Sequence, residues 1–131
     1  MTTPSPQEVL NTLMDARASE EGTRVAMGRL FLEITVAVPS TGDPAKPGGF
    51  TPLMVERDTH DCVVTLTSKL ALQRSQSVVP YALEMTGAAL ISSLQPHLGV
   101  LVENGTSSFV LTPAFVAYLR NEGSPSIPGQ G

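Results

Sequence analysis

Residues 99–113 read GVLVENGTSSFVLTP, and this stretch decides the class of fold. Two short apolar runs flank the polar sequence ENGTSS, and Asn-Gly favours tight turns because both residues tolerate left-handed backbone conformations. The stretch therefore predicts two antiparallel strands joined by a turn. Thr112 followed by Pro113 then predicts the start of a helix, because threonine caps helices and proline suits their first position.

A second hairpin is predicted upstream of this stretch. Residues 51–57 (TPLMVER) and 62–68 (CVVTLTS) are rich in β-formers and flank the short polar sequence DTHD. Apolar side chains at helical spacing predict further helices, and each of these starts at a residue that can act as a cap: Ser5, Thr23, Ser68 and Thr86. The mixed order predicts an α+β fold, with a mixed, largely antiparallel sheet of about five strands and helices packed on one face.

Proline marks two further strands. Residues 34–38 (ITVAV) alternate and are β-branched, and Pro39 is predicted to end that strand. Residues 78–85 (VVPYALEM) predict a short strand, and Pro80, which has no N–H to donate to a neighbour, implies either an edge position or an irregular entry to that strand.

Composition indicates one folded domain. The chain has 131 residues, of which 41% are hydrophobic and 15% charged, which is enough apolar material for one core. We assign residues 1–122 to a single domain. Residues 123–131 (GSPSIPGQG) are dominated by Gly, Pro and Ser, so a disordered C-terminal tail is expected.

The charge excludes two classes of partner. Eight Lys and Arg stand against twelve Asp and Glu, which gives a formal net charge of -4, and the basic residues are scattered. Nucleic acids and anionic membranes both require a basic face, so neither is expected as a partner. The N-terminal sequence MTTPSPQEVL lacks the basic and apolar regions of a signal peptide, so a cytoplasmic protein is expected.

Neither a metal nor a cofactor is expected. Cys62 is the single cysteine, and the paired spacing of zinc ligands is absent. The glycines of residues 42–49 precede a predicted strand instead of a helix, and the Lys-Ser/Thr pair of a phosphate-binding loop is missing.

Catalysis has two weak candidates. His60, Asp61 and Cys62 are adjacent, but neighbouring side chains of an extended strand point to opposite faces and do not converge. Cys62 is therefore interpreted as a small core residue. His97 follows Pro96 at the predicted end of a helix, where a histidine complements the negative helix end. Either histidine would need a carboxylate brought near by folding, so no catalytic residue is assigned.

The polar turn is interpreted first as a structural connection between two strands. If the protein has a small-molecule or peptide site, this turn is the first candidate, because polar loops on a rigid sheet often carry function. The site comprises Asn104, Gly105, Thr106, Ser107 and Ser108.

The order of these segments resembles the N-terminal domain of the SseB family. The matching stretches are residues 38–39 (VP), 66–68 (LTS), 103–107 (ENGTS) and 111–113 (LTP). The family's Asn-Pro-Gly turn lacks its proline here, and residues 81–84 have no counterpart. The resemblance implies a small cytoplasmic bacterial domain without established catalytic residues.

Three functions follow as hypotheses. The first is a non-enzymatic binding or accessory module that acts on another protein, either a separate partner or a second copy in a homodimer. The second is a small secretion-associated chaperone or adaptor, which needs a self-complementary apolar patch. The third is an enzyme centred on His60 or His97.

Overall fold

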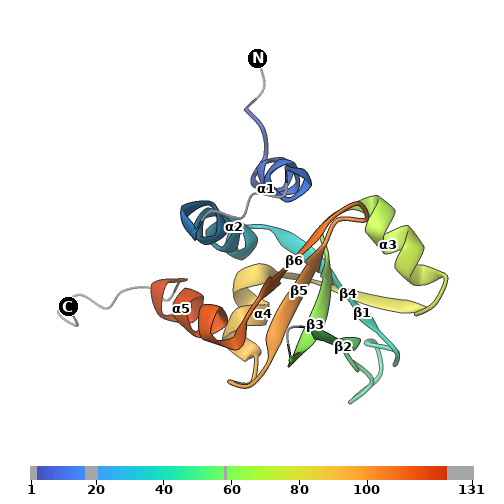
Figure 1. The fold of residues 1–131 in the computed structure, drawn as a ribbon. Helices are drawn as coiled ribbons and strands as arrows, with labels where there is room; N and C mark the ends of the chain where they lie inside the picture. Colours follow the sequence, from blue (N-terminus) through green and yellow to red (C-terminus); the bar gives the residue numbers. More distant parts are fainter. Residues whose placement is uncertain (1–2, 17–20, 58, 124–131) are drawn as a thin grey trace.

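The computed structural model describes residues 3–16, 21–57 and 59–123 (Figure 1). This part of the chain forms an α+β fold with five helices and a mixed, mostly antiparallel sheet of six strands, so the predicted fold class is confirmed. The helices are α1 (Pro6–Asp15), α2 (Glu21–Glu33), α3 (Lys69–Gln76), α4 (Gly87–Ser93) and α5 (Pro113–Gly123). The strands are β1 (Thr35–Ser40), β2 (Met54–Arg57), β3 (His60–Leu66), β4 (Tyr81–Thr86), β5 (Gly99–Glu103) and β6 (Ser108–Leu111).

The sheet has the order β4-β1-β3-β5-β6. Strand β2 lies off this order: it pairs with the first half of β3, whose last residue, Leu66, pairs with Ala37 of β1. Both predicted hairpins form: β2 pairs antiparallel with β3, and β5 pairs antiparallel with β6. The pairing of β3 with β5 is parallel, with Val64 opposite Leu101. The described strands β4 and β6 lie at the two ends of the order, so the edge position, one of the two alternatives implied by Pro80, is confirmed for β4.

Helices lie on both faces of the sheet. Apolar side chains of α1, α2, α4 and α5 form one cluster with Val36, Val38, Val63, Val100, Val102 and Leu111. On the opposite face, Ala71 of α3 packs with Ala37, Cys62, Val64, Leu66 and Leu101. Figure 1 shows α3 on the side away from α2 and α5. The expectation of helices on one face therefore holds for four described helices, and α3 departs from it.

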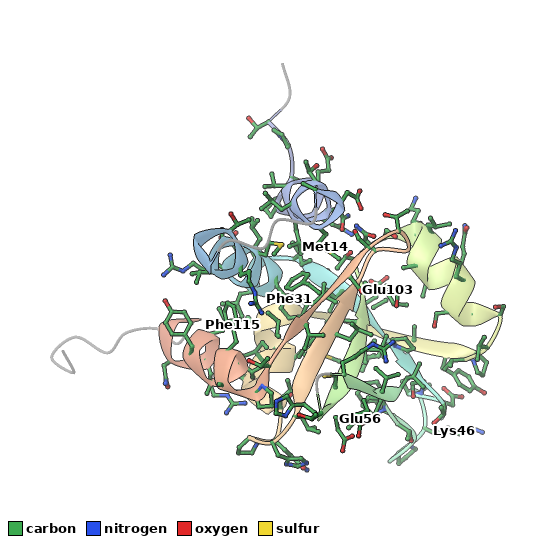
Figure 2. All side chains as sticks on the ribbon, in the orientation of Figure 1. Met14, Phe31, Lys46, Glu56, Glu103 and Phe115 are labelled. Carbon is green, nitrogen blue, oxygen red and sulfur yellow. The ribbon has the colours of Figure 1, made fainter. Side chains whose placement is uncertain are left out.

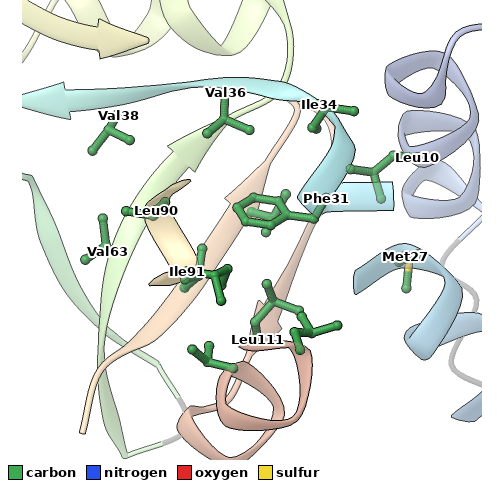
Figure 3. Packing of buried hydrophobic residues seen from close by; sticks show 14 of the residues in the cluster. Leu10, Met27, Phe31, Ile34, Val36, Val38, Val63, Leu90, Ile91 and Leu111 are labelled. Atoms are coloured by element: carbon green, nitrogen blue, oxygen red, sulfur yellow. The ribbon is translucent and has the colours of Figure 1, made fainter. Parts of the chain in front are cut away.

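Phe31 is the largest fully buried side chain of the main cluster. Figure 3 shows its ring among Leu10 of α1, Ile34 between α2 and β1, Ile91 of α4 and Leu111 of β6. The backbone of Phe31 is equally crowded. A Cβ added at Gly87, the first residue of α4, would lie 1.9 Å from the Phe31 carbonyl oxygen, so α4 reaches α2 only because residue 87 is glycine.

Side-chain caps fix where four helices begin. Ser5 accepts a hydrogen bond from the Glu8 N–H at 3.2 Å, and Ser68 does the same for α3 from Ala71 at 3.1 Å. Thr86 caps α4, and the hydroxyl of Thr112 accepts from the Phe115 N–H at the start of α5. These caps confirm the predicted starts, because each hydroxyl satisfies a backbone donor that has no partner within the helix.

The predicted start of α2 and the predicted end of β1 are both wrong. Helix α2 begins at Glu21, so Thr23 lies inside its first turn and is not the residue preceding the helix. Strand β1 continues through Pro39 to Ser40. The carbonyl oxygen of Pro39 accepts from the Leu53 N–H at 2.8 Å, on the edge of β1 that faces away from β4. The N–H that proline lacks would lie on that same edge, so no hydrogen bond between β1 and β4 is lost.

The C-terminal part also differs from the expectation. Helix α5 extends to Gly123, the residue at which the tail was predicted to begin, and residues 124–131 of that tail lie outside the described residues. None of the helices in the described ranges is both long and apolar enough to cross a membrane.

Candidate functional site

The turn between β5 and β6 is held together by Asn104. Its side chain is 5% exposed, and its Oδ1 accepts from the backbone N–H groups of Thr106 at 2.9 Å and Ser107 at 2.8 Å. Gly105 has a φ of +96°, a backbone conformation that side chains disfavour. Asn104 and Gly105 therefore shape the turn, as the structural interpretation predicted.

Asp15 at the end of α1 ties the turn to the helices. Its Oδ1 accepts hydrogen bonds from Asn104 Nδ2 at 3.0 Å, Thr106 Oγ1 at 2.7 Å and Ser107 Oγ at 2.7 Å. The bonds from Ser107, Thr106 and Asn104, in that order of effect, lower the pKa of Asp15 below its usual value, because all three stabilise the carboxylate. We call these four residues the Asp15 network.

The opposite side of the turn is bound to α3. The hydroxyl of Ser68, the cap of α3, donates to the carbonyl oxygen of Asn104, and the Arg74 guanidinium donates to the carbonyl oxygen of Gly105. The turn is thus anchored from both faces of the sheet. This anchoring gives it a fixed shape and position.

The lowered pKa gives the first testable prediction. Because the folded pKa lies below the unfolded one, the contribution of the Asp15 carboxylate is complete above the unfolded pKa, near 3.8, and disappears as pH falls through the lower folded value. The Asp15→Asn variant lacks this charge. Relative to the variant, the native chain is therefore expected to lose unfolding free energy as pH falls from about 3.8 through the lower folded pKa. Urea unfolding of both proteins from pH 7 to below pH 3.8 measures it. A difference that does not change with pH would contradict the prediction.

A groove of about 430 Å³ opens beside the turn. Thr106, Ser107 and Ser108 line it on one side, and its remaining described lining is apolar: Leu13, Met14, Met27 and Phe109. Helices α1 and α2 supply three of these apolar residues and β6 supplies the fourth. Figure 2 shows the side chain labelled Met14 on the side of the sheet where Phe31 and Phe115 also lie. The groove therefore combines hydroxyl groups with an apolar floor.

The structure distributes the predicted binding residues between two roles. Asn104 and Gly105 build the turn, whereas Thr106, Ser107 and Ser108 also line the groove. Asp15 was missed by the sequence analysis. An acidic residue in the last turn of a helix is unfavourable beside the negative helix end, and that mismatch was the available signal that Asp15 has another partner.

The histidines lie apart from this site. His60 begins β3, where it pairs with Arg57 of β2. His97 lies beyond α4, which ends at Ser93 and not at Pro96, so His97 is not at a helix end as predicted. It lines an apolar pocket of about 380 Å³ near Phe50, and none of the described residues in that lining is acidic. The described lining thus supplies no carboxylate partner for His97 in this pocket.

Cys62 is fully buried in the cluster beneath α3, in agreement with its interpretation as a core residue. Within the described ranges, no group of three or more His, Cys, Asp or Glu side chains is arranged to hold a metal ion.

No protein-family model, curated protein or solved structure matches this chain. The resemblance to the SseB N-terminal domain stays a prediction, and function is argued from the site itself.

Proposed function

We propose that the protein is a non-enzymatic binding module that holds a segment of a partner protein in the groove beside the Asp15 network. One observation carries the proposal: the polar side chains of the network are bonded to one another, while the adjoining groove with its apolar floor stays open. A groove with one fixed wall loses little conformational entropy when it is filled. Its volume falls within the range of about 300–1,000 Å³ typical of binding pockets.

The floor of the groove favours an apolar side chain of the partner. Met14 and Met27 supply thioether groups, and Phe109 supplies an aromatic ring. Methionine is unbranched and polarisable, so such a floor adapts to an inserted Leu, Met or Phe. Thr106 and Ser107 also line the groove, and their hydroxyl groups donate to Asp15. Toward a bound peptide their oxygens can accept a hydrogen bond from a main-chain N–H.

The charge of Asp15 favours a basic residue beside that apolar anchor. All three side-chain hydrogen bonds described for this carboxylate go to Oδ1, and the residue is exposed. No described residue donates to Oδ2, so within the described part of the chain this oxygen can accept a charge-assisted hydrogen bond from a Lys or Arg of the partner. The proposed ligand is a peptide segment with one large apolar residue next to a basic one. The SseB-like resemblance, which implies no catalytic residues, supports the same function.

A displayed library of random peptides tests the proposal. The full chain is immobilised, peptides are selected, and their affinities are measured by fluorescence anisotropy. We expect an apolar residue beside a Lys or Arg among the selected peptides. The Leu13→Trp variant fills the groove and is expected to weaken binding at least tenfold, which corresponds to about 1.4 kcal/mol.

Thr12→Trp is the matched control, because Thr12 is exposed on the same helix and does not line the groove. Its affinity is expected to equal that of the native chain. Asp15→Asn is expected to weaken binding at low salt more than at high salt, since the charge pair is screened. Selected peptides that bind the Leu13→Trp variant as tightly as the native chain would overturn the groove as the site.

A further inference from the structure

We propose that two copies of the chain associate by antiparallel pairing of their β4 strands about a two-fold axis at Leu83. Strand β4 is an end of the strand order, and no described element pairs with its outer edge. Two apolar side chains on this strand are unusually exposed, Tyr81 at 39% and Leu83 at 36%. An open edge with apolar side chains is a template for pairing with another strand.

The pairing of β1 identifies the backbone groups on that open edge. The carbonyl oxygen of Pro39 points away from β4, because it accepts from the Leu53 N–H. In an antiparallel pair the N–H and C=O of one residue point to the same side and alternate along the strand. Val38 therefore bonds toward β4, and its partner Leu83 bonds inward. The outward groups belong to the alternate residues: Ala82, Glu84 and Thr86.

Only outward-facing residues can form the hydrogen-bonded pairs of a dimer, which limits the register. With Leu83 opposite Leu83 of the second copy, Ala82 exchanges hydrogen bonds with Glu84 of the second copy. Glu84 then faces a neutral alanine. The side chains of Ala82 and Glu84 lie on one face of the sheet. On the opposite face, Tyr81 packs against Met85 of the second copy and the two Leu83 side chains meet, so the exposed apolar groups cover one another.

The same register also accommodates the proline that precedes the strand. It places Pro80 opposite Thr86 of the second copy. Pro80 has no N–H to donate, but Thr86 is the cap of α4, so its carbonyl oxygen already accepts a helical hydrogen bond. The N–H that Pro80 lacks would therefore have faced a carbonyl oxygen that already has a hydrogen-bond donor.

The neighbouring registers are less favourable. A shift of two residues in one direction places Glu84 opposite Glu84, which brings like charges together in the middle of the interface. A shift in the other direction places Pro80 opposite Glu84, whose carbonyl oxygen then has no donor. Charge and hydrogen bonding thus select the Leu83-centred pairing. One strand pair buries less than the roughly 1,200 Å² of a standard stable interface, so the dimer is expected to dissociate on dilution.

Molecular mass measured by light scattering over a dilution series tests the association. We expect the mass to rise toward twice 13.8 kDa as concentration increases. Tyr81→Lys is expected to abolish this rise. Tyr118→Lys is the matched control, because Tyr118 is 41% exposed but lies on α5, away from β4 (Figure 1). A monomer at every concentration, or equal loss with both variants, would overturn the proposal.

Disulfide trapping tests the register. The Leu83→Cys variant should form a covalent dimer on oxidation, because Cα atoms of non-hydrogen-bonded partners lie about 4.5 Å apart, within disulfide range. Glu84→Cys is expected to remain largely uncrosslinked, and the native chain is the blank because Cys62 is buried. Efficient trapping at position 84 in place of 83 would contradict the Leu83-centred pairing.

Discussion

The Phe31→Ala variant is expected to lose about 3–5 kcal/mol of unfolding free energy, the range measured for large aromatic truncations in tight cores. Phe31 is fully buried where α1, α2, α4 and the sheet meet. The carbonyl oxygen of Phe31 lies against Gly87, so the backbone beside the new cavity cannot collapse freely to fill it. Domains of this size are stabilised by only about 5–15 kcal/mol, so much of the total would be lost.

Urea unfolding followed by far-ultraviolet circular dichroism measures this loss. The matched control is Phe50→Ala, because Phe50 is only partly buried at the margin of the same cluster. Its truncation leaves a site open to solvent, so a loss of about 1 kcal/mol is expected. Equal losses for the two variants would show that Phe31 is not the centre of the core.

The Asn104→Ala variant is expected to lose about 2–3 kcal/mol of unfolding free energy. At this largely buried position, two backbone N–H groups lose their acceptor and one side-chain hydrogen bond is removed. The N–H groups are those of Thr106 and Ser107, and the side-chain bond is to Asp15. The turn would then no longer be held against α1. Selected peptides should therefore also bind more weakly, and urea unfolding with anisotropy measures both effects.

Asn104→Asp separates the two roles of this side chain. The replacement keeps an acceptor for the backbone N–H groups but places a second carboxylate about 3 Å from that of Asp15. Such a pair raises the pKa of one member, so the penalty is full at neutral pH and is relieved as pH falls through the raised pKa. The variant should gain stability on mild acidification relative to the native chain. An Asn104→Asp variant with native stability at neutral pH would show that the contact with Asp15 is unimportant.

Local chemistry made much of the fold predictable from sequence. Ser5, Ser68, Thr86 and Thr112 each act within three residues of themselves, so their capping roles can be recognised without tertiary information. The errors occur where distant residues decide the outcome. Pro39 continues a strand because the N–H of Leu53, a residue outside β1, donates to the carbonyl oxygen of Pro39. The carbonyl oxygen of Leu53 accepts from Val64, so it does not need the N–H that proline lacks.

The candidate site was predictable in part for the same reason. The turn sequence from Asn104 to Ser108 indicates a polar turn by itself, and the structure places that turn beside the groove. The groove needs Met14 and Met27, whose helical spacing identifies them as apolar but not what they face. Asp15 lies 89 residues from Asn104, so no local pattern connects them.

The sequence by itself determined the elements of this protein: where most helices begin, which segments form hairpins, and that the chain builds an α+β sheet. These are outcomes of short-range hydrogen bonding and alternating hydrophobicity, which involve residues close in the chain. The tertiary structure decided that α3 covers the second face and that α1 meets the β5–β6 turn. Those features depend on the order in which strands assemble, since that order sets which distant side chains share one surface.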